Sequence, residues 1–348
     1  MAYTTINKPS ATAFNTNLYT GNSTATSHAV GFQPDFTWLK VRNGSGGHYL
    51  FDAIRGATKN LRSDATNAEA TDAQTLKSFD SNGYTVGTSN SVNTNNETMV
   101  GWNWKANGAG SANTDGDQST TVSANTTSGF SIVKYTGTGT TTNFGHGLGA
   151  KPNVILIKSL SSNDWVMNGD FLGSTTWQHK IILNSTAAKA TANNFNDQAP
   201  TNSVFYLNSA HGTTNGSGQD YIAYCFADVQ GYSKVSGSYT GNGNADGTFI
   251  YTGFKPAFFL IKNINNASDD WHIMDNKRNG YNPQNNILQP NLSGAETSST
   301  RVDFLSNGIK INSSSGYINR SGEKIIYMAF AEAPLVGGTG GGVPCTAR

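Results

Sequence analysis

Three stretches of the chain share one pattern, in which a glycine and a proline precede a short run of aromatic or aliphatic residues. They read G-F-Q-P-D-F-T-W-L-K at residues 31–40, G-A-K-P-N-V-I-L-I-K at 149–158 and G-F-K-P-A-F-F-L-I-K at 253–262. The apolar run is too short for a helix, and proline, which cannot donate to a sheet ladder, is tolerated where a strand starts. The pattern therefore predicts a turn that leads into a buried strand, at three places along the chain.

Each stretch is followed, further along the chain, by a second strand in which large residues stand at alternate positions. The large residues are Val100, Trp102 and Trp104, then Ile222, Tyr224 and Phe226, and finally Ile326, Met328 and Phe330. Side chains of a strand point to opposite faces in turn, so each trio is expected to face a core. Residues on the other face are mostly small, such as Gly101, which indicates close packing there as well. This is the pattern of a central strand in a β-sandwich.

These landmarks recur at a regular spacing and divide the chain into repeats. Gly149 and Gly253 are 104 residues apart, as are Ile222 and Ile326. Repeats of about 100 residues have the size of ordinary domains, and short strands between turn signals are typical of sandwiches. The predicted fold class is all-β, with three tandem jelly-roll or lectin-like β-sandwich repeats, each burying its own core. The predicted boundaries are 1–108 for the first repeat, 109–128 for a polar linker, 129–232 and 233–335 for the second and third repeats, and 336–348 for a flexible Gly-rich tail.

The composition of the chain bears on whether it binds nucleic acid or a membrane. Charged residues make up 13% of the chain and the formal net charge is +1, so long-range attraction to nucleic acid or to an anionic membrane is not expected. No apolar run reaches the roughly 18 residues that a membrane span requires, and the first residues lack the basic and apolar segments of a signal peptide. The sequence therefore predicts no nucleic-acid partner and no membrane insertion.

Residues that could carry catalysis are sparse. The chain has six histidines, and none recurs at the same position of the repeats. No pair of carboxylates stands in a motif of the glycan-cleaving enzymes, which need an acid and a base at a workable separation. The run N-T-D-G-D at residues 113–117 has carboxylates spaced as in a calcium loop, but no downstream glutamate completes it. We expect no enzymatic activity, no metal site and no cofactor.

Two repeated features suggest ligand contacts. An asparagine precedes the end of each alternating strand by eleven residues, in a polar loop, and amide side chains suit the recognition of sugar hydroxyls. An Asp-x-x-Arg pair recurs in the first and third repeats, where the second repeat has Asn168 and Phe171. Both features have plain structural alternatives, as turn residues and as local ion pairs. The candidate ligand-binding residues are Asn93, Asn215, Asn319, Arg55, Arg278 and Trp177; the tryptophan has no counterpart in the other repeats and is expected to be exposed.

Several motifs together resemble a family of proteins encoded by tailed bacteriophages, many of them marine. They are Y-T-G-N-G, G-F-K-P, F-D-A-I-R-G-A-T-K, W-N-W-K-A-N-G, S-A-N-T-T-S-G-F-S-I-V and I-Y-M-A-F-A-E. Members of that family are described as tail-fibre or virion structural proteins with lectin-like repeats. The resemblance covers residues 19–332 and implies no catalytic residues. It implies a location on the exterior of the virion, after assembly in the host cytoplasm.

The leading functional hypothesis is a tail fibre or tail-tip adhesin that binds host surface glycan without cleaving it. A capsid decoration or head-fibre protein that binds other virion proteins is the alternative, and a glycan depolymerase is the third. The expected partners are other virion proteins and host cell-surface glycan. A homo-oligomer is also expected, with a trimer favoured because the appendages of phages are commonly trimeric.

Overall fold

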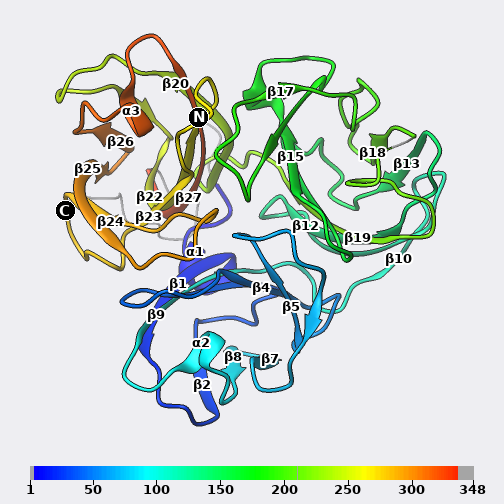
Figure 1. Cartoon of the computed structure of the whole chain (residues 1–348), viewed down its shortest axis with the longest axis horizontal. Coiled ribbons are helices and arrows are strands. Elements are labelled where there is room, and N and C mark those ends of the chain that lie inside the picture. The colour runs from blue at the N-terminus through cyan, green and yellow to red at the C-terminus, as the bar shows by residue number, and fades with distance from the viewer. Residues whose placement is uncertain (1–3, 210, 336–348) are drawn as a thin grey trace.

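The computed structural model describes residues 4–209 and 211–335, and the regular structure of this part is almost entirely β (Figure 1). It contains 27 strands, which form several antiparallel sheets, and four short helices. The helices are α1 (Pro9–Thr12), α2 (Asn90–Asn93), the 3-10 helix η1 (Asp170–Leu172) and α3 (Gly316–Asn319). No helix among the described residues is long and apolar enough to cross a membrane. The predicted all-β class is confirmed.

Three large sheets, called here the first, second and third sheets, each come from one continuous part of the chain. The first has the order β1 (Phe14–Thr20), β9 (Thr98–Trp104), β3 (Phe36–Val41), β4 (Tyr49–Asp52), β5 (Lys59–Arg62) and β6 (Ala70–Thr71). The second has the order β10 (Ser111–Asn113), β11 (Thr120–Asn125), β12 (Phe130–Thr136), β19 (Asp220–Phe226), β14 (Val154–Ser159), β15 (Trp165–Gly169), β16 (His179–Ile182) and β17 (Ala190–Thr191). The third has the order β20 (Ser233–Thr240), β27 (Lys324–Pro334), β22 (Phe254–Asn263) and β23 (His272–Asp275).

A small sheet accompanies each large one, which makes the arrangement sandwich-like. The small sheets are β2 (Thr26–Ala29), β8 (Gly83–Val86) and β7 (Leu76–Asp80); then β13 (Thr142–Gly145) and β18 (Val204–Leu207); and finally β21 (Phe249–Tyr251), β26 (Gly308–Ile311), β25 (Thr297–Leu305) and β24 (Gln284–Ile287).

The large sheets have the same strand order and register around their central strands. In each, the strand with alternating large residues lies beside the strand that follows the Gly/Pro turn, so that Trp102 faces Trp38, Tyr224 faces Leu156 and Met328 faces Leu260. The first two turns place their prolines just before β3 and β14. In the third, Pro256 lies inside β22, where the register with β27 shifts, as expected of a residue that cannot complete a ladder.

The three large sheets surround the centre of the molecule (Figure 1), and their alternating large residues all belong to one apolar cluster. Phe330 of the third sheet packs against Phe14 and Trp104 of the first, with ring centroids 5.6 and 5.5 Å apart, and against Phe226 of the second at 6.0 Å. The prediction that these residues face a core is confirmed. The expectation of a separate core in each repeat is incomplete, because the three sheets also bury these faces against one another in a shared core.

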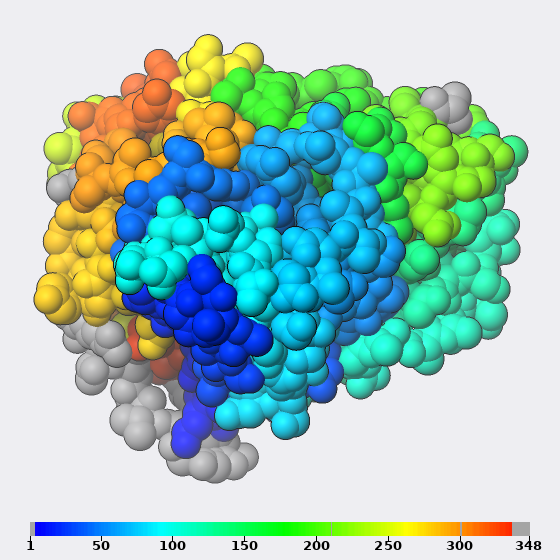
Figure 2. Space-filling model, turned by 60° about the horizontal axis from the view of Figure 1, so that its bottom comes forward, coloured from blue at the N-terminus to red at the C-terminus, as the bar shows by residue number. Residues whose placement is uncertain are grey.

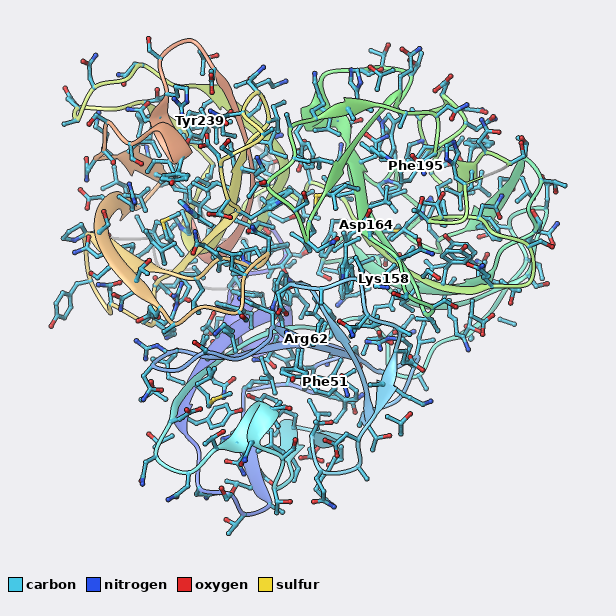
Figure 3. The ribbon with its side chains drawn as sticks, in the orientation of Figure 1. Phe51, Arg62, Lys158, Asp164, Phe195 and Tyr239 are labelled. Carbon is cyan, nitrogen blue, oxygen red and sulfur yellow. The ribbon has the colours of Figure 1, made fainter. Side chains whose placement is uncertain are left out.

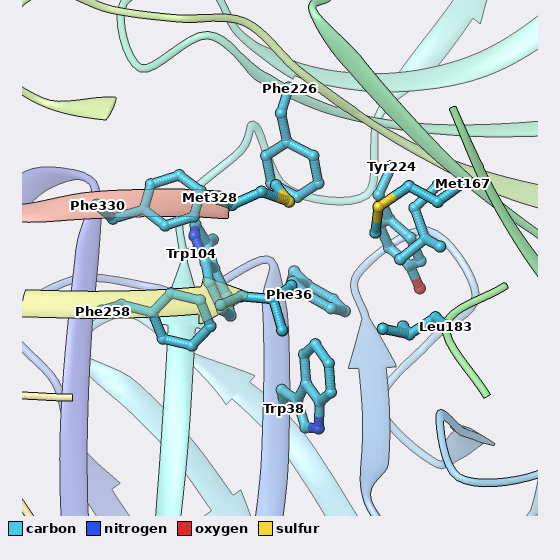
Figure 4. Close-up of a pocket in the computed structure, with 12 residues that line it drawn as sticks. Phe36, Trp38, Trp104, Met167, Leu183, Tyr224, Phe226, Phe258, Met328 and Phe330 are labelled. Carbon is cyan, nitrogen blue, oxygen red and sulfur yellow. The ribbon is translucent and has the colours of Figure 1, made fainter. Parts of the chain in front are cut away.

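Packing at this centre is nearly complete. A cavity of about 30 Å³ remains between the three sheets, lined entirely by apolar and aromatic side chains such as Phe36, Tyr224, Phe258 and Met328 (Figure 4). This is about the volume of one water molecule in the liquid, and an apolar lining gives a water few partners. On their opposite faces, the first and second sheets pack against their small sheets through two separate apolar clusters.

Residues 109–128 are not the structureless linker that their polar sequence predicts. They contain β10 and β11, which extend the second sheet beyond β12. Thr120, Val122 and Ser123 are buried there. Backbone hydrogen bonds to the edge of β12 hold this segment, so it needs few apolar side chains. The predicted tail at 336–348 lies outside the described residues.

Candidate functional site

The three asparagines predicted to contact a ligand are buried. Asn93 and Asn319 end α2 and α3, Asn215 lies in the corresponding turn, and none exposes more than 1% of its surface. Each side-chain Oδ1 accepts a hydrogen bond of 2.9 Å from a backbone N–H, those of Asn22, Thr138 and Asn242. Each Nδ2 donates to a backbone carbonyl at 2.7 Å. These amides therefore hold turns together, and their hydrogen-bonding groups are occupied inside the protein.

Arg55 is also a structural residue. Its side chain is 1% exposed and forms an ion pair with Asp52 and a longer one, at 3.3 Å, with Glu69. Asp52 in turn accepts a hydrogen bond of 2.8 Å from the hydroxyl of Tyr224, which belongs to the second sheet. Burial lowers the pKa of Arg55, but the carboxylate of Asp52 outweighs it, so the pKa lies above its usual value. The cluster ties the first sheet to the second.

Arg278 occupies the same position in the third sheet, and its side chain is fully buried. It pairs with Asp275 and, at 2.8 Å, with Glu296. Asp275 accepts a hydrogen bond of 3.0 Å from Nε1 of Trp102 in the first sheet. The local ion pair is therefore the correct interpretation of both Asp-x-x-Arg motifs, with the addition that each pair joins two sheets.

The register corrects the sequence alignment of the second sheet by one residue. Asp52 faces Phe36 and Asp275 faces Phe258, whereas the matching Val154 faces Gly169. The counterpart of the aspartate is thus Gly169 rather than Asn168, and the counterpart of the arginine, three residues on, is Leu172 rather than Phe171. Asn168 points to the other face, where its Nδ2 donates to the carbonyl of Trp177 at 2.8 Å.

Trp177, predicted to be exposed, is completely buried. Its ring packs against Phe195, with centroids 5.5 Å apart, and its Nε1 donates to Asp170 at 3.0 Å. Its neighbours in the sequence, T-T-W-Q-H-K, are polar and conceal this role. The tryptophan belongs to the apolar cluster on the outer face of the second sheet.

An open polar pocket of about 390 Å³ lies on the corresponding outer face of the first sheet. It is formed by β4, β5, β6 and the adjoining loops, with α2 on one side, in the part of the molecule that comes forward in Figure 2. The polar side chains that line it are Tyr49, Asn60, Arg62, Asn67, Asp72, Thr75 and Ser91. None of these residues is among the candidates predicted from the sequence, although one of those candidates, Asn93, lies on the same short helix as Ser91.

Arg62 and Tyr49 face each other across β4 and β5 (Arg62 is labelled in Figure 3). The guanidinium lies over the tyrosine ring, 5.8 Å from its centroid. It is also held by Asp64, whose hydrogen bond raises the pKa of Arg62. About a third of the Arg62 side chain, 34%, stays exposed, so it can donate to a ligand without moving far.

Asn60 forms the floor of the pocket. It is 6% exposed, and its side-chain amide has no hydrogen-bonding partner among the described residues. Asp72 adds an acceptor, although it is already engaged by Ser89 at 3.1 Å. An amide, a guanidinium, a carboxylate and a tyrosine ring around one open hollow are suited to a ligand with many hydroxyl groups.

Other residues stand at the matching place of the second sheet. Strand pairing puts Val166 and Ile182 where the first sheet has Tyr49 and Arg62. Lys180, opposite Ala190, takes the place of Asn60, opposite Ala70. The sequence did place Tyr49 and Arg62 on the outer face. Each of them stands next to an inward residue, Leu50 or Leu61, and neighbouring side chains of a strand point to opposite faces.

Among the described residues, no group of three or more His, Cys, Asp and Glu side chains could hold a metal ion. Asp115, in the incomplete calcium loop, is bonded to Asn113 at 2.8 Å.

These features define an all-β protein in which three sheets surround a common core and the first sheet carries an open polar pocket on its outer face. The chain belongs to a family known as a domain of unknown function, DUF7483, whose model matches residues 8–334. Comparison with curated proteins and with solved structures gave no match.

Proposed function

We propose that the protein is a non-catalytic structural protein of a bacteriophage virion, a tail fibre or tail-tip adhesin, which binds host surface glycan. The observation that carries this proposal is the pocket of the first sheet. The side-chain amide of Asn60 has no hydrogen-bonding partner among the described residues and stays accessible from the pocket, so it can donate to and accept from a ligand. Sugar hydroxyls both donate and accept, so they complement Asn60, Arg62 and Asp72 together.

The assignment to a virion rests on the resemblance of the sequence motifs to phage proteins. We also propose the finer description of the fold, three tandem jelly-roll or lectin-like repeats with the boundaries given above, except that residues 109–128 join the second repeat. The common strand order and register of the three large sheets support it. A homotrimer remains part of the proposal, with other virion proteins as partners and the virion exterior as the location.

A capsid decoration or head-fibre protein is the second candidate. It is favoured by aromatic side chains that the third part of the chain presents to solvent, since aromatic residues are enriched where proteins bind one another. Phe249, Tyr251 and Tyr281 are 45%, 63% and 74% exposed. Binding of the purified protein to empty capsids, and its loss in Tyr251→Ser, would favour this candidate over the adhesin.

The adhesin proposal is tested with an array of bacterial surface glycans and the full-length protein. We expect wild type to bind a subset of the glycans, and Asn60→Ala and Arg62→Ala to weaken that binding at least about tenfold. Lys180→Ala, at the position of Asn60 in the second sheet, is the matched control and should bind as wild type does. Undiminished binding by both folded pocket variants would contradict the proposal. Release of reducing ends from a bound glycan would instead indicate a depolymerase.

A further inference from the structure

Among the described strands, β1 lies at the edge of the first sheet with only β9 as a neighbour. Backbone hydrogen bonds from Lys105 to Ala13 at 2.9 Å and from Gly21 to Glu97 at 2.8 Å flank its pairing with β9. Antiparallel pairs alternate, so the odd-numbered residues between them bond to β9. The even-numbered residues point their N–H and C=O groups away from the sheet: Phe14, Thr16, Leu18 and Thr20. No described residue bonds to these backbone groups.

This edge lacks the features that usually protect an exposed strand. Its sequence, F-N-T-N-L-Y-T, has no charge and no proline, and its seven residue pairs with β9 run without a bulge. Leu18 is 41% exposed. By contrast, β20, the matching edge of the third sheet, contains Lys234 and a register shift before Gly237. Natural proteins use charges and bulges of this kind to keep edge strands from pairing. Because β1 has neither, its edge is suited to pairing with another strand.

The second sheet shows how such a partner would lie. There β12 takes the place of β1, and its edge is covered by β11. Phe130, Ile132 and Lys134 of β12, which correspond to Phe14, Thr16 and Leu18, face Asn125, Ser123 and Thr121. The same sheet geometry therefore accepts one more antiparallel strand at this edge.

Space for the end of an added strand is present beside β1. A crevice of about 200 Å³ separates Phe14 and Thr16 from Ala331 and Ala333 at the end of β27. Thr16 is 5% exposed, and its Oγ1 has no hydrogen-bonding partner. The small alanines leave room for a backbone to approach, although the Thr16 hydroxyl itself is buried.

We propose that β1 binds an extended, uncharged segment of another polypeptide as an additional antiparallel strand. Main-chain hydrogen bonds to Thr16 and Leu18 supply the binding, and small or β-branched side chains fit the crevice. The glycan pocket lies on other strands, β4 to β6, so this interaction is independent of carbohydrate binding.

The test uses the full-length protein and a fluorescent peptide with the sequence of residues 118–126, Q-S-T-T-V-S-A-N-T, which contains β11. Fluorescence anisotropy should show saturable binding to wild type and at least about tenfold weaker binding to Leu18→Lys. Ser238→Lys, which places the same charge at the matching exposed position of β20, should bind as wild type does. Leu18→Pro removes one outward N–H and keeps the bonds to β9, so it should weaken binding as well.

Melting curves establish that each variant is folded. The proposal is overturned if wild type shows no saturable binding up to millimolar peptide, or if folded Leu18→Lys binds as tightly as wild type. It is also overturned if sedimentation shows a wild-type dimer that Leu18→Lys dissociates, because the edge would then belong to a second copy of this chain.

Discussion

The contact between the second and third sheets differs from the other two contacts around the common core. Where the first sheet meets the second, and the third meets the first, a buried aspartate, arginine and glutamate lie together, and an aromatic residue of the facing sheet donates to the aspartate. Where the second meets the third, the corresponding residues are Gly169, Leu172 and Lys189, and the facing residue is Met328. The two contacts that involve the first sheet, called here the polar contacts, thus have an aspartate, an arginine and a glutamate. The contact between the second and third sheets, called here the apolar contact, has none of these three residue types at the corresponding positions.

One backbone hydrogen bond between the two sheets recurs at all three contacts. The N–H of Glu69 donates to Leu160, that of Glu296 to Arg42 and that of Lys189 to Ile264, at 2.9, 2.6 and 3.0 Å. The side chains alone therefore account for the difference. Met328 has no hydrogen to donate, and a buried carboxylate without a donor is costly. We conclude that the aspartate, its arginine partner, the glutamate and the aromatic donor occur together at a contact or are all absent from it.

Removal of residues 1–108 should have the largest effect, because it removes both polar contacts and leaves the apolar one. The remaining chain would expose Tyr224, Phe226 and Phe330 to water. We expect it to aggregate or to lose fixed tertiary packing, as seen by gel filtration and near-ultraviolet circular dichroism. A monomeric fragment with cooperative unfolding would show that the second and third sheets do not need the first.

Arg278→Met should cost about 3–5 kcal/mol of unfolding free energy, since it leaves the buried carboxylate of Asp275 without its ion-pair partner. The matched change at the apolar contact, Leu172→Met, nearly conserves volume and should cost less than about 1.5 kcal/mol. Urea unfolding of both variants measures the difference. Equal losses of unfolding free energy in the two variants would mean that the ion pairs stabilise the polar contacts no more than Leu172 stabilises the apolar one.

Tyr224→Phe should have a smaller effect, about 1–3 kcal/mol, because it removes only the hydroxyl that donates to Asp52. Met328→Leu, at the matching position of the third sheet, removes no hydrogen bond and serves as the control. If the tyrosine variant unfolds at the same urea concentration as wild type, Arg55 alone satisfies the aspartate.

A further expected effect involves the buried lysines of all three sheets and depends on pH. Lys40, Lys158 and Lys262 are fully buried, and burial lowers the pKa of each to about 8. The unfolded chain therefore binds more protons between about pH 8 and 10, so stability should rise with pH there, by at most ~1.4 kcal/mol per pH unit for each lysine. Lys262→Met should reduce the slope by about a third, whereas the more exposed Lys180→Met should leave it unchanged. A flat profile in wild type would show that these lysines titrate normally.

Much of the local structure could be predicted from the sequence. The Gly/Pro stretches lead into β3, β14 and β22, and the alternating residues form β9, β19 and β27, with their large side chains inward. Little of the candidate site could be predicted. Asn93, Arg55 and Trp177 share the residue types of ligand sites, yet they are buried, while Tyr49 and Arg62 lie in no repeated motif.

The sequence by itself determined where strands start and which of their faces is apolar, because alternation and turn chemistry act between residues close in the chain. Only the tertiary structure decided what those faces meet. Tyr224 reaches Asp52 and Trp102 reaches Asp275 from more than 170 residues away, since the three sheets close around one core. The pocket is open for a similar reason: Trp177 and Phe195 pack over the outer face of the second sheet, whereas on the first sheet the part of the chain that the structure describes leaves a hollow beside Tyr49 and Arg62.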